Sequence, residues 1–348
     1  MKVLYGVQGT GNGHIARARV MHRALKEKGV EVDLLFSGRE KDKYFSMDDF
    51  GDYQTCRGLT FVTENGKIDH IKTVAKNSAI QFSKEVKQLD LTKYDAVLND
   101  FEPVSAWAAK RNKVPCIGIS HQNAFRYHVP TRGVSWLDRQ IIEYFAPSTC
   151  HIGLHWYHFD QPLLPPIIDT LCCSKQSDDY LLIYLPFENL QQVMDLCHRF
   201  VTHKFVCYHP DVTDTHQVDN IELKPLNYTD FQQHLACCLG VIANGGFELP
   251  SEALVRGKKL LLKPLTGQFE QVSNADTLEA LGLASTMEHL DAAKVRQWLD
   301  EENPESIHYP DVASPLVDWI ISANWSNTES LSHQLWEQVD FPSYVSHS

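Results

Sequence analysis

The chain has 348 residues, which is enough for two domains that each bury a core, and it carries a net charge of −12 with 43% hydrophobic residues. This composition excludes a disordered chain and a disulfide-stapled mini-protein, and the acidic balance argues against a general affinity for nucleic acid. The charge is unevenly divided, because residues 1–168 have 22 basic and 18 acidic side chains whereas residues 169–348 have 10 and 26. We therefore expect two domains with different partners.

The first half of the sequence alternates short apolar runs with amphipathic segments. Strands are expected at Lys2 to Val7, Glu31 to Ser37, Ala96 to Leu98 and Cys116 to Ser120, and helices at Ile15 to Lys28, Val74 to Leu89 and Val104 to Arg111. A repeated strand-helix order is typical of a parallel sheet with helices on both faces. We therefore predict an α/β domain over residues 1–165.

A stretch with adjacent prolines, LLPPIIDTLCCSKQS, interrupts the pattern and predicts a linker at residues 166–178. The alternation then restarts, with strands expected at Tyr180 to Leu185, Lys204 to Tyr208, Gly240 to Ala243 and Lys259 to Leu262, and helices at Leu190 to Phe200, Tyr228 to Ala236 and Glu248 to Arg256. This predicts a second doubly wound α/β domain at 179–312. A helix near Leu316 to Ile321 belongs to a C-terminal segment, residues 313–348.

A glycine loop with Gly9, Gly11 and Gly13 lies between the first strand and the first helix, and His14 ends it. Glycines let backbone N–H groups approach a ligand, and the helix N-terminus favours an anion. The third glycine does not fit the dinucleotide fingerprint. Arg39, after the second strand, is nevertheless of a type that binds the 2′-phosphate of NADP, so NADP binding is kept as an alternative. A tight turn without a ligand is the alternative for the loop. Histidine at the carboxyl edge of a parallel sheet suits a general base, with a simple helix-capping role as its alternative.

A second strand-to-helix turn, at Asn244 to Leu254, contains Gly245 and Gly246. The backbone N–H groups of Gly245, Gly246 and Phe247, together with the helix dipole, predict a cradle for a diphosphate. Glu252, one turn into the helix, is placed to reach a ribose hydroxyl pair. After the next strand, a loop through Gln268, Glu270, Gln271 and Asn274 supplies amide and carboxylate groups for sugar hydroxyls.

This ordered set of motifs resembles the GT-B glycosyltransferases over roughly Met1 to Leu283. It is most similar to the branch of the peptidoglycan N-acetylglucosaminyltransferase and the UDP-glucuronosyltransferases, and to related uncharacterised bacterial and archaeal glycosyltransferase-like proteins. The resemblance implies two Rossmann-like domains facing each other across a cleft, the first for the acceptor and the second for the nucleotide sugar. It also implies a last helix that crosses back to the first domain.

The resemblance further implies roles for individual residues. Gly245, Gly246 and Phe247 would hold phosphates, Ser251 would support their turn, Glu252 would bind ribose, and Gln268, Glu270 and Gln271 would address the sugar. His14 would deprotonate the acceptor hydroxyl, and Asp100, at the end of its strand, would orient His14 or replace it. Members of the family generally transfer without a bound divalent metal, because the helix N-terminus neutralises the leaving diphosphate, and no cofactor is expected here. Many relatives have a basic residue where Asn244 stands, so neutralisation of the diphosphate is expected to depend more on the helix dipole or on Arg and Lys from the other domain.

Two further segments have more than one interpretation. His151, His155 and His158 have spacings found among metal ligands, but no carboxylate or cysteine nearby completes a zinc site, so no metal is predicted. The stretch Phe125 to Phe145 mixes arginines with aromatic residues. It fits a helix packed on the sheet, and as the alternative an amphipathic surface that meets a membrane or a lipid-linked acceptor.

The location follows from the cysteines and the apolar segments. Nine cysteines without a C-x-x-C pair favour reduced thiols over disulfides. No secretory signal and no membrane-spanning stretch is recognisable. We expect a cytoplasmic protein that has at most peripheral contact with the inner face of a membrane.

The function expected from these features is metal-independent, inverting transfer of a sugar from a nucleotide sugar, a UDP-sugar in the first place, to an acceptor hydroxyl. The acceptor is a small molecule, a glycan or a lipid-linked compound, and nucleic acid is not expected as a partner. One alternative is an epimerase or hydrolase of the nucleotide sugar on the same fold. Another is a protein that binds the nucleotide sugar without turnover.

Overall fold

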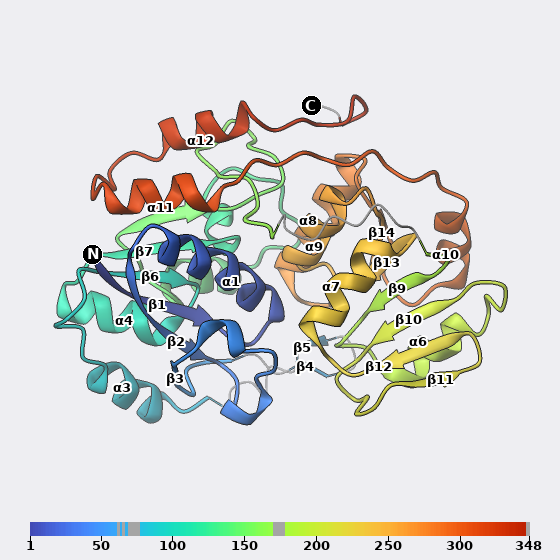
Figure 1. The fold of residues 1–348 in the computed structure, drawn as a ribbon, viewed down its shortest axis with the longest axis horizontal. Helices are drawn as coiled ribbons and strands as arrows, with labels where there is room; N and C mark the ends of the chain where they lie inside the picture. The colour runs from blue at the N-terminus through green and yellow to red at the C-terminus, as the bar shows by residue number, and fades with distance from the viewer. Residues whose placement is uncertain (61–62, 65–66, 69–76, 170–177, 346–348) are drawn as a thin grey trace.

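The computed structural model describes residues 1–60, 63–64, 67–68, 77–169 and 178–345, which form two α/β halves placed side by side (Figure 1). The predicted α/β class with two doubly wound sheets is confirmed. The predicted linker at 166–178 lies largely outside the described residues, which omit 170–177.

Within the described residues, the first sheet has the strand order β3-β2-β1-β6-β7-β8, and all of its neighbours are parallel. Its strands are β1 (Lys2–Gln8), β2 (Glu31–Ser37), β3 (Tyr53–Thr55), β6 (Ala96–Asp100), β7 (Cys116–Ser120) and β8 (Cys150–Gly153). Its helices are α1 (Asn12–Glu27), α3 (Ala79–Gln88), α4 (Pro103–Asn112) and α5 (Trp136–Tyr144), with short 3-10 helices at Lys41–Lys43, Asp48–Phe50 and Gln122–Arg126. Strands β4 (Thr63–Glu64) and β5 (Lys67–Ile68) pair with each other.

The side-chain alternation of β1 shows why helices cover both faces of this sheet. Val3, Tyr5 and Val7 pack into the same core as the buried residues of α1, whereas Leu4 packs with the buried residues of α4 on the other face. Because all four of these residues have no exposed surface, β1 is a central strand that is buried on both sides.

The second sheet has the order β11-β12-β10-β9-β13-β14-β15 in the described part of the chain, and only the edge pair β11-β12 is antiparallel. Its strands are β9 (Leu181–Tyr184), β10 (Phe205–Tyr208), β11 (His216–Val218), β12 (Ile221–Lys224), β13 (Gly240–Ala243), β14 (Lys259–Leu262) and β15 (Ser285–Thr286). Helices α6 (Leu190–Cys197) and α10 (Ala292–Leu299) cover one face, and α7 (Tyr228–Cys237), α8 (Glu248–Val255) and α9 (Phe269–Ala280) cover the other.

The C-terminal segment lies against the first half of the molecule (Figure 1). Helix α11 (Ala313–Ile321) packs its buried residues into the α1 core, and Lys28 at the end of α1 pairs with Asp318 at 2.8 Å. In helix α12 (Glu329–Trp336), Ser332 Oγ and Trp336 Nε1 both donate to the carbonyl oxygen of Leu163, at 2.6 and 2.8 Å. The end of the chain therefore bridges back to the domain in which the chain begins.

Two predicted loops are shorter in the structure than expected. Helix α1 begins at Asn12 with Gly11 as its N-cap, so Gly13 and His14 belong to its first turn. The segment that contains Glu270, Gln271 and Asn274 was predicted as a loop, and this prediction was wrong, because α9 begins at Phe269. The physical reason is capping: the side-chain oxygen of Gln268 accepts a hydrogen bond from the backbone N–H of Gln271 and starts the helix.

The amphipathic stretch at α5 is only partly packed. Ile142 is buried and Ile141 packs against the α4 core, whereas Trp136 is 74% exposed and Leu137 and Tyr144 are each 53% exposed. Helix packing therefore explains only part of this apolar surface.

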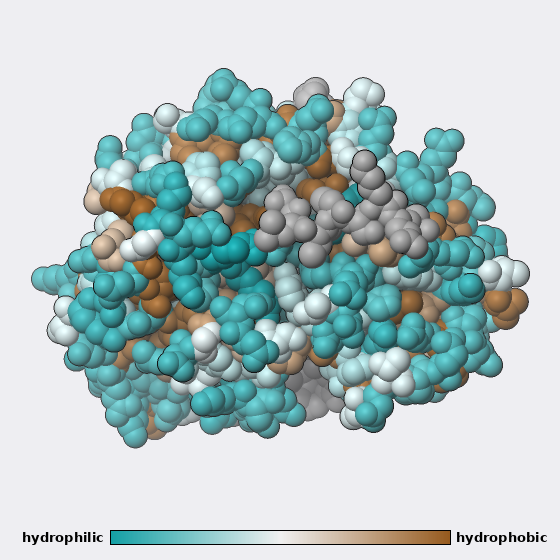
Figure 2. All heavy atoms as spheres, in the orientation of Figure 1, coloured by the Kyte–Doolittle hydropathy of each residue, from teal (hydrophilic) through white to brown (hydrophobic). Residues whose placement is uncertain are grey.

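On the face shown in Figure 2, hydrophobic residues form small, separate patches within a mostly hydrophilic surface. None of the helices in the described ranges has both the length and the apolar character needed to cross a membrane.

Candidate functional site

The carboxyl ends of strands from both sheets point toward each other, and polar side chains join them across the gap. Asn12, in the first turn of α1, donates to the hydroxyl of Tyr184 at the end of β9, at 2.7 Å. Gln122 donates to both carboxylate oxygens of Glu270 in α9, at 3.0 and 3.1 Å. Because ligands of open α/β sheets bind at this edge, the space between the two edges is the candidate site.

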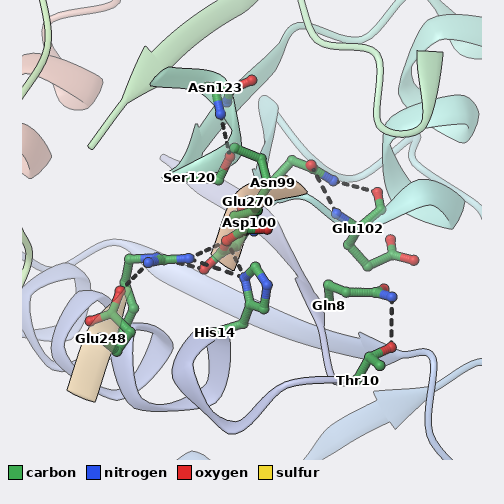
Figure 3. A network of polar contacts seen from close by, with 12 residues as sticks. Gln8, Thr10, His14, Asn99, Asp100, Glu102, Ser120, Asn123, Glu248 and Glu270 are labelled. Carbon is green, nitrogen blue, oxygen red and sulfur yellow. Dashed lines mark hydrogen bonds and ion pairs between the residues drawn. The ribbon is translucent and has the colours of Figure 1, made fainter. Parts of the chain in front are cut away.

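His14 and Asp100, which come from distant parts of the sequence, are in contact at this edge (Figure 3). Strands β1 and β6 are neighbours, and their register pairs Val7 with Asp100 just before the loop that leads to His14. His14 Nδ1 lies 2.8 Å from Asp100 Oδ1, and the carboxylate is fully buried whereas the imidazole is 14% exposed. His14 Nδ1 also lies 3.1 Å from Arg17 Nη2, which can only donate. Because the contact with Asp100 is shorter and a carboxylate only accepts, we assign the proton to Nδ1, which leaves the lone pair of Nε2 for another partner.

Arg17, which the sequence analysis did not single out, completes this pair. Its Nε donates to Asp100 Oδ2 and its Nη2 to Asp100 Oδ1, both at 2.8 Å. His14 and Arg17 are three residues apart on α1 and therefore share one helix face. Burial raises the pKa of Asp100, but the Arg17 guanidinium and His14 outweigh it and leave the pKa of this carboxyl below its ordinary value. Asp100 is thus a buried carboxylate that stays ionised beside His14.

Glu248, the first residue of α8, brings the second domain into the cluster. Its Oε1 accepts a hydrogen bond from Arg17 Nη1, and its side chain is 7% exposed. Burial raises the pKa of Glu248 to about 8, against the opposing effect of Arg17. At neutral pH the carboxyl is therefore mainly protonated and accepts the Arg17 hydrogen bond through its carbonyl oxygen.

The raised pKa of Glu248 predicts a pH-dependent stability. The unfolded chain releases this proton near the ordinary value of 4.5 and the folded chain only near 8, so stability is lost as the pH rises between these values. From pH 6 to 9 this group alone is expected to cost roughly 3 kcal/mol, at about 1.4 kcal/mol per pH unit until it ionises. Urea unfolding of the wild type and of Glu248→Gln at both pH values measures this difference. Glu27→Gln, at the exposed end of α1, is the control, and an equal pH dependence in all three proteins would contradict the prediction.

The glycines of the first loop have different reasons to be glycine. A Cβ on Gly13 would lie 3.0 Å from Glu248 Cγ, and one on Gly9 would lie 2.2 Å from the Tyr44 hydroxyl. A Cβ on Gly11 would meet nothing closer than His14 Cδ2 at 3.8 Å. Packing therefore explains Gly9 and Gly13, and the space beside Gly11 is the part of the loop that a ligand can approach.

The predicted diphosphate cradle lies at the start of α8. A Cβ on Gly245 would be 2.5 Å from the carbonyl oxygen of Gln271, whereas Gly246 faces open space. Phe247 stacks on His121 of the first domain, with ring centroids 4.1 Å apart and an angle of 8° between the rings. Ser251 Oγ donates to the Phe247 carbonyl at 2.7 Å and accepts from Trp156 Nε1 at 2.8 Å. The turn is thus held in place by contacts of Phe247 and Ser251, and the side of the turn at Gly246 is left open.

Glu252, the expected ribose ligand, is buried one turn further along α8. It is 5% exposed, and Gln232 of α7 donates to its Oε2 at 2.9 Å. Burial raises its pKa, and the nearby charge of Arg256 opposes this effect. The carboxyl is therefore held in one orientation by α7.

The three expected sugar ligands at the start of α9 differ in their contacts. Gln268 caps the helix, and Gln271 is turned back so that its Oε1 accepts from the backbone N–H of Leu265 at 2.9 Å. Glu270 instead faces the first domain, where it receives both hydrogen bonds of Gln122. Of the three, Glu270 is the side chain that the structure directs into the space between the domains.

Asn274 and Lys263 are additional polar residues at this edge. Asn274 Nδ2 donates to the carbonyl of Gly245 at 3.0 Å, and its Oδ1 lies 2.6 Å from His121 Nε2. Lys263, which the sequence analysis also missed, donates to Glu188 Oε1 at 2.6 Å and accepts from Asn244 Nδ2 through its carbonyl. A basic side chain is therefore present beside Asn244, although it belongs to the same domain, directly after β14.

The three histidines of the HIGLHWYH segment do not converge on one point. His151 Nδ1 lies 2.7 Å from Ser148 Oγ, while His155 Nδ1 accepts from the backbone N–H of Trp156 at 2.9 Å. Within the ranges that the structure describes, no group of three or more His, Cys, Asp and Glu side chains is arranged to hold a metal ion.

Comparisons with known proteins show the family and the fold of the chain. A model of glycosyl transferase family 1 matches residues 1–302. No curated protein sequence matches the chain. SsfS6 of Streptomyces sp. SF2575, a glycosyltransferase solved with thymidine diphosphate, superposes with a TM-score of 0.63 at 12% identity, over 93% of this chain and 100% of its own.

Two further solved structures share the fold. LpCGTa in complex with UDP has a TM-score of 0.58 at 12% identity, over 97% of this chain and 97% of its own. UGT89C1 of Arabidopsis thaliana, complexed with quercetin, has a TM-score of 0.59 at 12% identity, over 97% of this chain and 99% of its own. At these identities the likeness shows the GT-B fold, and the family model shows the kind of enzyme. The chain belongs to glycosyl transferase family 1 and is a GT-B glycosyltransferase.

Proposed function

We propose that this glycosyltransferase moves a sugar from a UDP-sugar to a hydroxyl group of a small-molecule acceptor, with inversion at the anomeric carbon and without a metal ion. The observation that carries this proposal is the placement of His14. Its Nδ1 is held by the buried Asp100, which leaves Nε2 as a base in the space between the domains. The N-terminus of α8, with Gly246 facing open space, lies in the facing domain.

In this reaction His14 Nε2 takes the proton of the acceptor hydroxyl while the oxygen attacks the anomeric carbon. The bond to the diphosphate breaks on the opposite side, so a single displacement inverts the configuration. The developing charge on the diphosphate faces the backbone N–H groups and the dipole of α8, which stabilise it without a cation. Glu252 binds the ribose, and Glu270 exchanges its bonds from Gln122 for the hydroxyls of the sugar.

The choice of substrates is supported by what the neighbours contain. Thymidine diphosphate is bound in SsfS6, UDP in LpCGTa and quercetin in UGT89C1. A nucleoside diphosphate donor and an aromatic small-molecule acceptor are therefore the substrates to test first. The finer resemblance, to the branch of the peptidoglycan N-acetylglucosaminyltransferase and the UDP-glucuronosyltransferases, stays a prediction.

Calorimetry with UDP, thymidine diphosphate and UDP-sugars tests the donor. We expect UDP to bind, and Glu252→Ala to weaken binding by about 10- to 100-fold, because a hydrogen bond to a charged group contributes about 1.5–3 kcal/mol. Glu279→Ala, at the exposed end of α9, is the matched control and should bind like the wild type. Unchanged UDP binding in Glu252→Ala, or the absence of nucleotide binding in the wild type, would contradict the proposed donor site.

Product analysis tests the reaction. With a UDP-sugar and a flavonol acceptor, we expect a glycoside whose anomeric configuration, read by NMR, is opposite to that of the donor, and an unchanged rate in EDTA. Without acceptor, an isomerised donor indicates an epimerase and a free sugar indicates a hydrolase. Tight binding without turnover across an acceptor panel indicates a sensor, and each of these results contradicts the proposed transfer.

A further inference from the structure

Arg17 of α1 is a buried cation between Asp100 and Glu248, and the reaction proposed above assigns no role to it. Its side chain is 2% exposed, and Nε and Nη2 reach the two oxygens of Asp100 side by side. This parallel pair of hydrogen bonds needs the planar guanidinium, because a lysine offers only a point charge. The remaining nitrogen, Nη1, donates to Glu248 at the start of α8. Arg17 is therefore fixed by both domains at once.

The charges around His14 show what this cation does. The titratable groups around the pair in the described chain include Tyr5 on β1, Arg17 on α1, Asp100 on β6 and Glu248 on α8. Two further groups lie at the edge of this set: His121, whose pKa burial lowers, and Glu252, whose pKa burial raises. Burial raises the pKa of the Tyr5 hydroxyl and of the Glu248 carboxyl, so Tyr5 is neutral and Glu248 is mainly protonated at pH 7. The charges that remain are those of Arg17 and Asp100, which balance. Without Arg17, the buried Asp100 would hold a proton on His14 or take one itself.

On the basis of the proposed transfer reaction, we propose that Arg17 is a positioning residue that holds Asp100 against His14 and balances its charge, so that His14 stays free to accept a proton. The bond to Glu248 makes this arrangement depend on contact between the two domains. His14 is thus kept able to accept a proton by Arg17, three residues away on α1. Arg17 is in turn held in place by Glu248 at the start of α8, the helix whose N-terminus faces the donor.

The test is a histidine titration that needs no substrate. The full-length protein is labelled at the histidine carbons, and the His14 signal is identified by its loss in His14→Gln. In Arg17→Met we expect the midpoint of the His14 titration to rise by about 1 to 3 pH units, the effect of one nearby charge. In Arg17→Lys we expect a rise of less than about half of that, because the charge is kept. An unchanged midpoint in Arg17→Met overturns the proposal.

Two further variants keep the test decisive. Glu248→Gln retains an acceptor for Nη1, so its His14 midpoint should equal that of the wild type, and a rise as large as in Arg17→Met would overturn the charge balance described here. If Arg17→Met does not fold, the double variant Asp100→Asn with Arg17→Met removes both charges, and its midpoint should lie below that of Arg17→Lys. A midpoint above that of Arg17→Lys overturns the proposal.

Activity separates positioning from stability. In Arg17→Met the acidic limb of the kcat/KM profile should move to higher pH with the His14 midpoint, whereas a loss of folded protein lowers the rate equally at every pH. In Arg17→Lys the limb should stay near its wild-type position while kcat falls. If no transfer is found in the wild type, the proposed function fails, and the titration still reports whether Arg17 controls His14.

Discussion

Replacing His14 with alanine is expected to lower kcat for glycosyl transfer by about 10²- to 10⁴-fold, the usual contribution of a general base. The imidazole of His14 is 14% exposed and can reach an acceptor, whereas Asp100 is fully buried between His14 and Arg17. Steady-state kinetics with a UDP-sugar and a saturating flavonol measures the loss. UDP affinity, measured by calorimetry, should stay within about twofold, since His14 acts on the acceptor.

His128→Ala is the matched control, because this exposed histidine belongs to the same domain and lies outside the cluster. It should transfer at the wild-type rate. If His14→Ala keeps more than a tenth of the wild-type kcat, another group is the base. Asp100→Asn then shows whether Asp100 acts directly, the alternative that the sequence left open.

The strand-to-helix units were predictable because each depends on a local pattern. Strand Gly240–Ala243 and the start of α8 at Glu248 follow from an apolar run, a glycine pair and a proline in the first helical turn. The start of α9 was missed, since Gln268, Glu270 and Gln271 form a polar run that looks like a loop. Only the capping bond from Gln271 N–H to Gln268 reveals that it is a helix.

The partners of the site residues were not predictable in the same way. A periodic pattern shows which face of a helix is buried, but it does not show what the face meets. Arg17 was missed because an arginine on an amphipathic helix is normally solvated, and its partners Asp100 and Glu248 are 83 and 231 residues away. The distinguishing signal was the spacing of His14 and Arg17 on one helix face, and it becomes meaningful only beside a strand that ends in aspartate.

Trp156 was missed for a different reason, because the histidines around it suggested a metal site. This tryptophan connects the first domain with the second. It is fully buried, and its ring lies 4.7 Å from that of Phe247 in the second domain. Its Nε1 donates to Ser251 at 2.8 Å, and its carbonyl accepts from the Tyr309 hydroxyl at 3.0 Å. One side chain thus contacts the turn of the predicted diphosphate cradle from the side of the first domain.

Trp156→Ala is therefore expected to lower the free energy of unfolding by about 3–5 kcal/mol, as for other buried tryptophans. This is the largest loss of stability that we predict for a single substitution in this protein. Trp156→Phe keeps most of the volume and loses the hydrogen bond to Ser251, so we expect a loss of about 1–3 kcal/mol. Urea unfolding at constant pH measures both.

Trp136→Ala is the matched control, because this tryptophan is 74% exposed, and the free energy of unfolding should fall by no more than about 0.5 kcal/mol.

The Trp156 variants also separate a packing role from a role in UDP binding. If Trp156 supports the cradle, Trp156→Phe should weaken UDP binding at temperatures where it is fully folded, because Ser251 loses a partner and the Phe247 turn loses its support. If Trp156→Phe is less stable but binds UDP like the wild type, the residue joins the domains without shaping the cradle. A loss below about 1 kcal/mol in Trp156→Ala would contradict the central position assigned to this side chain.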